Sequence, residues 1–412
     1  MRIAVIGAGI GGLAVAAGLQ RAGAEVVVYE RASEIRAVGA GLSLFGNGFA
    51  ALDALGLGDQ VRALGGTGLT LLAGQRKPSG QWLSRTPPAA VAELAVVHRA
   101  DLHRILLAAL TPGTVRCGAE VGAVFDGGTA LTLTSDPQRV ERFDLIVAAD
   151  GIRSRVRAGW STDPGVRYAG YTAWRGVTSK PVDLLGAAGE TWGRGHRFGI
   201  APLQDGRVYW FAVASMPAAT VIQDEYAAVS TLFRSWHAPI ADLIAATDRA
   251  AVFRLDINEM AGPVPSFRRG RCVLLGDAAH AMTPDLGQGG NQALEDAATL
   301  VRLIGVAADA PAGSSIDPVL ADYDRLRRPR TQMLARRARL LGKVAQAGGV
   351  VTARLRDAAM LLLPDNVTGR QLLAVQRWQP PPVADGAPHT GTNPTRTGTD
   401  PIMTTPHSEG SE

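Results

Sequence analysis

The stretch IAVIGAGIGGLAVAAGLQRAGAEVVVYE, residues 3–30, carries the strongest structural pattern of the chain. Its first five residues form a mostly apolar run, as expected for a strand buried on both faces. A glycine-rich turn and an apolar helical segment follow, and EVVVYE supplies a second strand. Strand, helix and strand within about 30 residues form a βαβ unit. The sequence therefore predicts an α/β fold built on a parallel sheet.

The turn GAGIGG, residues 7–12, matches the pattern GxGxxG between strand and helix. In such turns Gly7 allows the tight bend, Gly9 lets a pyrophosphate approach the backbone, and Gly12 permits close helix–strand packing. The N-terminus of the helix adds N–H groups and a positive dipole. Glu30 ends the second strand, where an acid suits a ribose hydroxyl. The pattern predicts a dinucleotide site, for NAD or FAD.

Composition is typical of a globular enzyme, with 412 residues, 46% hydrophobic and 19% charged. The two cysteines form no CxxC pair, which favours a reducing, cytoplasmic setting without a disulfide framework. We expect no signal peptide and no membrane span, because no apolar run is long enough to cross a bilayer. No internal repeats are found.

The net charge is +5, and much of the basic excess lies in RLRRPRTQMLARRARLLGK, residues 325–343. A basic helix can bind nucleic acid or acidic membranes. No aromatic residues interleave with the arginines, which favours a solvated helix face that also attracts phosphate-bearing cofactors. We therefore expect no nucleic-acid partner and no stable membrane association.

Changes in residue pattern and composition along the chain divide it into segments. Alternating strand and helix patterns assign 1–70, 95–165 and 263–320 to a nucleotide-binding α/β domain. Aromatic strands separated by Gly, Pro and Asp turns assign 71–94 and 166–262 to a β-rich substrate domain. Residues 321–375 form a C-terminal helical segment, and the Pro-, Gly- and Thr-rich tail, 379–412, is predicted to be disordered.

Two further motifs follow apolar strands. FDLIVAAD, residues 143–150, continues into GIRSRVR, and the strand ending at residue 275 continues into GDAAHAMTPDLGQGGNQALEDA, residues 276–297. Together with GAGIGG they resemble the class A flavoprotein aromatic hydroxylases, single-component FAD monooxygenases of the para-hydroxybenzoate and salicylate hydroxylase type. The resemblance covers about residues 1–375. It implies a Rossmann-like FAD-binding domain interleaved with a β-sheet substrate domain and followed by C-terminal helices.

The resemblance assigns roles around FAD. Asp277 would bond a ribityl hydroxyl, with a turn cap as the alternative, and Gly287 to Asn291 would lie against the flavin ring under a rigid Pro284. Asp150 and Arg153 would serve FAD and NAD(P)H, or would merely end a strand. The expected cofactor-binding residues are Gly7, Gly9, Gly11, Gly12, Glu30, Arg31, Ser43, Arg99, Val121, Asp150, Arg153, Asp277, Pro284, Gly287, Gly289, Gly290 and Asn291.

His280 lies three residues after Asp277, but no second His or Cys stands at ligand spacing. A packed or capping histidine is therefore expected, and no metal site.

The substrate side is predicted from HRFGIAPLQDGRVYWFAV, residues 196–213, which forms a hairpin. A three-residue loop would put Arg197 and Tyr209 on one face, and a two-residue loop would put them on opposite faces. Both match an arginine and a tyrosine of bacterial FAD-dependent urate hydroxylases, and Asp285 matches their Thr-Pro-Asp acid. These three are the candidate catalytic residues, and Trp174 and Arg175 are weaker candidates.

The implied reaction is hydroxylation of a small aromatic or heteroaromatic ring. NADH or NADPH would reduce FAD, and O2 would then give a flavin C4a-hydroperoxide whose distal oxygen is transferred. Epoxidation or tailoring of a larger natural product would use the same motifs, and a non-catalytic flavin-binding protein is a third hypothesis. Halogenation and hydrolysis are disfavoured, because neither Trp-x-Trp-x-Ile-Pro nor Gly-x-Ser-x-Gly is present. A monomer or a homodimer fits the sequence.

Overall fold

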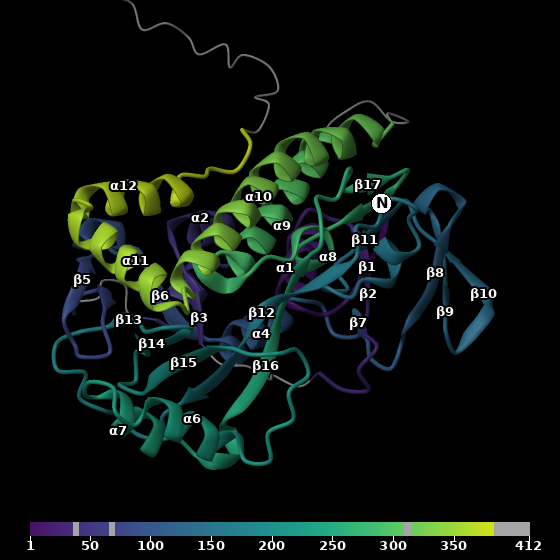
Figure 1. Ribbon diagram of the computed structural model, residues 1–412. Coiled ribbons are helices and arrows are strands. Elements are labelled where there is room, and N and C mark those ends of the chain that lie inside the picture. The colour runs from purple at the N-terminus through teal and green to yellow at the C-terminus, as the bar shows by residue number, and fades with distance from the viewer. Residues whose placement is uncertain (36–40, 66–70, 309–314, 383–412) are drawn as a thin grey trace, which may run out of the picture. The chain divides into compact units, whose positions relative to one another are not determined.

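The computed structural model describes residues 1–35, 41–65, 71–308 and 315–382, and Figure 1 shows them as a ribbon. Residue contacts gather Met1–Pro381 into one compact unit. The tail predicted to be disordered lies outside the described residues from residue 383 onward, and the glycine-rich loop of residues 39–48 is described only from residue 41.

The predicted parallel sheet is present. Its strands are β1 (Arg2–Ile6), β2 (Glu25–Tyr29), β7 (Val115–Arg116), β11 (Leu145–Ala148), β17 (Arg268–Arg269) and β18 (Cys272–Leu274), and all pair in parallel except β17, which pairs antiparallel with β18. Helix α1 (Ile10–Arg21) packs on β1 and β2, and α9 (Gly289–Ala308) packs on α1. The strand order is β17-β18-β11-β1-β2-β7. Val5 lies opposite Val147 and Val28, and all three are fully buried. The glycine turn thus follows a central strand, as the apolar run predicted.

A larger sheet of seven strands carries the aromatic segments. Its strands are β4 (Gly74–Arg76), β5 (Trp82–Arg85), β12 (Val166–Val177), β13 (Gly189–Trp192), β14 (His196–Pro202), β15 (Val208–Ser215) and β16 (Phe253–Met260), in the order β16-β12-β15-β14-β13-β4-β5. Helices α6 (Glu225–Phe233) and α7 (Ile240–Ala245) cover one face (Figure 1). On that face Trp174, Phe198 and Trp210 form a buried cluster with Phe233. The opposite face is left for a site.

Strands β4 and β5 join this sheet across a long stretch of sequence, because β4 pairs in parallel with β13. The pairing agrees in outline with grouping 71–94 with 166–262. The domain boundaries themselves stay a prediction.

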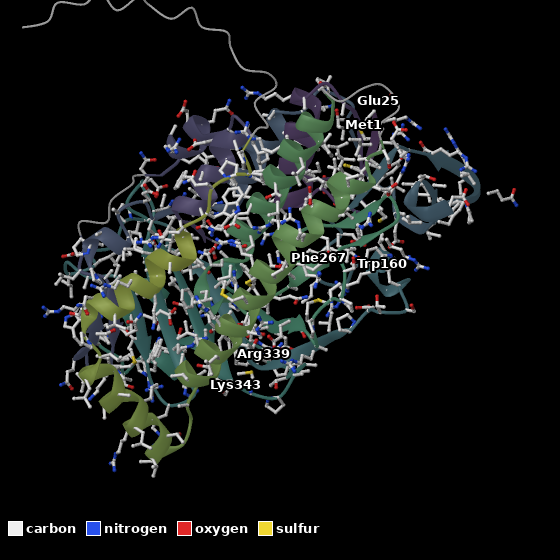
Figure 2. The ribbon with its side chains drawn as sticks, turned by 90° about the horizontal axis from the view of Figure 1, so that it is seen from above. Met1, Glu25, Trp160, Phe267, Arg339 and Lys343 are labelled. Carbon is white, nitrogen blue, oxygen red and sulfur yellow. The ribbon has the colours of Figure 1, made fainter. Side chains whose placement is uncertain are left out.

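Three helices close the described chain: α10 (Asp317–Ala345), α11 (Val350–Leu362) and α12 (Asp365–Gln376). The C-terminal helical segment expected over 321–375 is interrupted after Ala345, where Gly348 and Gly349 lie. α10 packs beside α9 (Figure 1), and Arg339 and Lys343 mark its later part in Figure 2. Arg339 Nε lies 2.8 Å from Glu259 Oε1 of β16. One helix therefore contacts both sheet systems.

The remaining elements are short. They are the strand pair β3 (Gly41–Leu44) and β6 (Ala95–His98), the three-stranded sheet β8 (Val121–Phe125), β9 (Ala130–Leu133) and β10 (Asp136–Arg142), the helices α2 (Gly46–Ala54), α3 (Gly58–Arg62), α4 (Arg99–Ala108), α5 (Arg155–Ala158) and α8 (Asp277–His280), and the 3-10 turns η1 (Pro88–Ala90), η2 (Asp126–Gly128), η3 (Arg249–Ala251) and η4 (Pro284–Leu286).

Candidate functional site

A cavity of about 1180 Å3 is lined by all three sequence motifs. The glycine turn after β1, the loop before α9 and the open face of the seven-stranded sheet meet there. Of the predicted residues, the lining includes Gly9, Gly11, Gly12, Ser43, Arg99, Arg197, Tyr209, Asp277, Pro284, Asp285, Gly287, Gly289 and Gly290. Most of the candidate positions, far apart in sequence, therefore share one cavity.

The first glycine turn has the geometry that a phosphate site needs. Gly7 has φ +101°, and a Cβ on Gly12 would lie 2.0 Å from the Gly7 carbonyl oxygen, so neither position accepts a side chain. A Cβ on Gly9 would meet no protein atom within 4 Å, and Gly9 lines the cavity at the N-terminus of α1. Backbone N–H groups at a helix N-terminus attract anions. The turn fits a pyrophosphate.

Glu30 lies against this turn rather than free in solution. Its Oε2 accepts a hydrogen bond from Ala8 N at 2.8 Å, and its Oε1 accepts one from Ala32 N at 2.9 Å. The carboxylate is thereby held beside the turn, with lone pairs left for a ribose hydroxyl. Arg31 next to it is exposed.

The loop before α9 forms the other end of the cradle. A Cβ on Gly289 would meet no protein atom within 4 Å, and Gly289 is the first residue of α9, a helix of 20 residues. The N-terminus of this helix therefore faces open space with positive dipole, as a reduced flavin ring requires. Asp277 is exposed to the cavity as the first residue of α8, and Pro284 begins η4.

Asn291 does not line the cavity. Its side chain is fully buried, and its Nδ2 donates to the carbonyl oxygens of Ser43 and Gly287 at 2.9 and 3.0 Å. Its Oδ1 accepts a hydrogen bond from Phe45 N. Asn291 therefore fixes the loop against β3, which is a positioning role.

The Asp-Gly motif lies at the edge of the site. Asp150 Oδ2 accepts hydrogen bonds from Arg155 N and Val156 N, so this carboxylate caps the first turn of α5. Its Oδ1 is buried without a partner among the described residues, and burial raises the pKa of the group. An unpartnered buried oxygen beside Gly151, a lining residue, fits a ligand hydroxyl. Arg153 is exposed outside the lining.

Two other predicted residues lie at different depths. Arg99, the first residue of α4, is exposed and lines the cavity. Val121 begins β8, is buried, and contributes nothing to the lining.

A buried ion-pair network that the sequence did not predict supports the motif of residues 276–297. Asp296 Oδ2 accepts from Gly276 N at 2.9 Å and pairs with His280 Nε2 at 2.6 Å. Arg327 of α10 donates to Asp296 at 2.6 Å and to Glu295 at 2.5 Å. Burial opposes ionisation of Asp296, but the charges of His280 and Arg327 outweigh it and lower the pKa of Asp296.

The network corrects one expectation about the basic helix. Arg327 is 1% exposed, so residues 325–343 are not simply a solvated face. The periodicity of α10 could have shown this, because Arg327 lies in register with buried Leu320, Tyr323, Thr331 and Leu334. His280 is packed, as expected. Among the described residues no group of three or more His, Cys, Asp or Glu side chains is arranged to hold a metal ion.

The hairpin has the register that places Arg197 and Tyr209 together. Ala201 pairs with Tyr209 and Arg197 with Val213, and Leu203 N donates to Arg207 O across a three-residue loop. The prediction from the three-residue alternative is confirmed. Tyr209 also packs against Gly41, where a Cβ would lie 2.4 Å from its ring.

Arg197 and Asp285 form a buried ion pair in the cavity wall. Arg197 Nη2 lies 2.7 Å from Asp285 Oδ1, and the two side chains are 3% and 0% exposed. Tyr171 Oη donates to Asp285 Oδ2 at 2.6 Å, and Gln346 Oε1 accepts from Arg197 Nε. Burial and the Asp285 charge raise the pKa of Tyr171. Asp285 belongs to the loop before α9, which is called the flavin-side loop below. The pair therefore joins that loop to the larger sheet.

Glu190 is a lining residue that sequence reasoning missed. Its Oε2 lies 3.5 Å from Arg197 Nη1 and accepts a hydrogen bond from Trp192 Nε1 at 2.7 Å. Burial raises the pKa of Glu190, and the positive charge of Arg197 offsets part of that rise. No motif marks Glu190, because it lies in the weakly patterned stretch GETWGRG.

The two weaker candidates face opposite ways, as alternation along β12 requires. Arg175 lines the cavity, and its buried Nε has no protein partner. Trp174 is fully buried on the far face and donates to Glu225.

Comparisons with known proteins agree with this geometry. The model of a family described as FAD binding domain matches residues 1–338. Aurachin C monooxygenase/isomerase of Stigmatella aurantiaca is 35% identical over 380 residues, covering 90% of this chain and 96% of that protein. 2-Heptyl-3-hydroxy-4(1H)-quinolone synthase of Pseudomonas aeruginosa is 32% identical over 381 residues, with shares of 90% and 96%. The structure of Klebsiella pneumoniae HpxO with FAD and uric acid superposes with a TM-score of 0.81 at 28% identity, covering 91% of this chain and 96% of that chain.

No helix among the described residues has both the length and the apolar character needed to cross a bilayer.

Proposed function

The chain belongs to the FAD-dependent aromatic hydroxylases that share this FAD-binding domain, and on this premise we propose that it oxidises an uncharged aromatic or heteroaromatic ring bound at Arg197, Glu190 and Tyr209. It is an FAD-dependent monooxygenase, with NADH or NADPH as co-substrate. The observation that carries the proposal is the contact between Arg197 of the larger sheet and Asp285 of the flavin-side loop. This contact brings a polar wall to the flavin cradle.

FAD held in the cradle would supply the activation of O2, and the oxygen atom that the ring receives would come from that O2. The chain's own residues hold and orient it. The N-terminus of α1 and the open backbone at Gly9 would bind the pyrophosphate, Glu30 would bind a ribose hydroxyl, and Asp277 would bind the ribityl chain. The N-terminus of α9 at Gly289 would stabilise the negative charge of the reduced ring.

The substrate end favours a ring with an N–H or O–H donor over a carboxylate. Arg197 already contacts Asp285 and lies 3.5 Å from Glu190, so a carboxylate at this guanidinium would meet two acids. Glu190 can instead accept a proton or a hydrogen bond from a phenol or ring amide. Loss of that proton makes the ring carbon more nucleophilic, and a base at hydrogen-bond distance promotes it. The buried wall also excludes water.

Two relatives bear names that agree with such a ring. HpxO was solved with uric acid, and another relative is a quinolone synthase. Both names describe nitrogen heterocycles that carry oxygen substituents. We propose this class first, and phenols second.

The test is NAD(P)H oxidation by the FAD-loaded protein with purines, quinolones, phenols and aromatic acids, with product mass and peroxide measured together. A heterocycle that accelerates oxidation and gains one oxygen atom supports the proposal. In Arg197→Met we expect this coupled oxidation to fall at least about tenfold, because the ring loses its polar contact (~1.4 kcal/mol per tenfold). The matched control is Arg194→Met, an exposed arginine three residues away. Preference for aromatic acids would contradict the assignment of Glu190.

We also propose the cytoplasm as the compartment, because Cys117 and Cys272 are both free thiols.

A further inference from the structure

The cavity continues beyond its polar end onto the C-terminal helices. Leu340, Leu341 and Val344 of α10 line it, together with Met360 of α11 and Leu363 directly after that helix. These five side chains are called the apolar wall. Their presence is unexpected for a site that holds only a flavin and a small polar ring.

The apolar wall begins where the ring site ends. Trp192 packs in one hydrophobic cluster with Leu341 and Met360. The indole Nε1 of the same Trp192 donates to Glu190, which faces Arg197. A ring held at Glu190 therefore has apolar surface on this side, across a single tryptophan.

The position of the apolar wall is fixed by the fold. Arg356 of α11 is 7% exposed and donates to the carbonyl oxygens of Gly193 and Ala345, at 2.9 and 3.0 Å. Its guanidinium also lies 5.7 Å from the centre of the Trp192 ring. These bonds tie α11 to β13 and α10. The wall is therefore a built surface and not a chance contact of side chains.

The wall carries apolar surface that nothing in the described chain covers. Leu340 is 64% exposed, Val344 42% and Leu363 49%. Exposed leucines occur elsewhere on α11, such as Leu355 at 66%, but Leu355 does not line the cavity. When a ligand covers apolar surface that is continuous with a binding cavity, the burial of that surface favours binding.

We propose that the apolar wall binds a hydrocarbon chain carried by the aromatic substrate, so that the substrate class is a ring with an apolar tail of several carbons. The proposal rests on the proposed function, because it places the ring at Glu190 and Arg197. The tail runs from the ring past Trp192 and along α10 toward Leu340 and Val344. The wall then sets substrate preference by chain length.

The experiment measures dissociation constants by perturbation of flavin absorbance in the FAD-loaded protein, without NAD(P)H. The probes are 2-alkyl-4(1H)-quinolones and 4-alkylphenols with methyl, pentyl and heptyl chains. A fully buried methylene strengthens binding about fourfold. Because the wall is open on one side, we expect about twofold per methylene, so that heptyl binds at least about sixtyfold more tightly than methyl.

Two leucines of similar exposure supply the matched variants. In Leu340→Gln we expect the ratio of methyl to heptyl dissociation constants to fall at least about threefold, because the tail loses an apolar contact. In Leu355→Gln the ratio stays that of the parent protein, because this leucine lies outside the cavity. Both side chains are largely exposed, so both variants are expected to fold.

Three outcomes overturn the proposal: binding that is flat with chain length, no binding by any probe in either series, or equal effects of the two variants. The last would indicate nonspecific adsorption of the alkyl chains to exposed leucines of α10 and α11 rather than binding in the cavity. If tail-dependent binding is found but NAD(P)H gives no oxygenated product, the proposed function fails and this inference stands.

Discussion

Replacing Arg197 by methionine removes the positive partner of a buried ion pair. Asp285, whose side chain is 0% exposed, would keep the hydroxyl of Tyr171, 2.6 Å away, as its one side-chain partner in the described part of the chain. Breaking a buried pair by removing one partner costs about 3–5 kcal/mol, because the remaining charge is buried and uncompensated. We expect the free energy of unfolding of Arg197→Met to fall by about that amount.

A double-mutant cycle with Asp285→Asn tests whether the lost stability comes from the interaction between Arg197 and Asp285. Asp285→Asn alone should cost about 2–4 kcal/mol, since Arg197 keeps Glu190 at 3.5 Å. The double variant should lose less than the sum of the two single losses, by about 2 kcal/mol, as expected for residues in direct contact. The assay is equilibrium urea unfolding followed by circular dichroism, with flavin fluorescence recorded in parallel to detect loosening of the cradle.

The same hairpin supplies a control with equal geometry and different burial. Arg207 Nε lies 2.7 Å from Asp205 Oδ2, but these side chains are 38% and 53% exposed. Exposed pairs contribute about 0–1 kcal/mol, so Arg207→Met should lose no more than that. If Arg197→Met is destabilised no more than Arg207→Met, or if the two losses in the cycle simply add, the reasoning about the buried pair is refuted.

Three further predictions follow from single positions. Gly9→Ala should fold normally but bind FAD at least about tenfold more weakly (~1.4 kcal/mol), because its Cβ occupies space open to the cofactor; equilibrium dialysis should show no loss for Gly305→Ala, where a Cβ also meets nothing. Arg327→Met should lower the free energy of unfolding by about 3–5 kcal/mol, whereas Arg325→Met, at a 68% exposed side chain, should change it by under about 1 kcal/mol; urea unfolding of both variants checks this. Burial raises the pKa of Glu190 in the folded state, so the wild type should lose stability relative to Glu190→Gln as the pH rises above 4.5, the ordinary value for this carboxyl. Urea unfolding of both proteins at a series of pH values checks this. A difference in free energy of unfolding that does not change with pH would contradict the raised pKa of Glu190.

Structural features that depend on residues close together in the sequence could be predicted. The apolar run at residues 3–6 gave a central strand, and GxGxxG gave its turn, because both depend on local backbone geometry and strand burial. The β14–β15 hairpin was predicted as well, but its register was left open between a two-residue and a three-residue loop, and the structure has the three-residue loop. Alternation along β12 would also have separated Trp174 from Arg175, since neighbouring residues on a strand face opposite ways.

Features that depend on distant contacts could not be predicted in this way. The parallel pairing of β4 with β13 joins segments separated by more than a hundred residues, and no local pattern announces it. Glu190 is defined as a site residue only by the approach of Arg197 and Trp192. Arg327 is an intermediate case, because its helical register was visible but a basic stretch normally indicates solvent exposure.

The most direct test of the central claim is turnover under isotope-labelled O2. FAD-loaded protein is supplied with NAD(P)H and the heterocycle that it binds most tightly, and the product is analysed by mass spectrometry. The account predicts that one labelled oxygen atom enters the ring for each NAD(P)H oxidised, with little peroxide. Oxidation that yields only peroxide across all heterocycles and phenols, or a product whose oxygen comes from water, would contradict it.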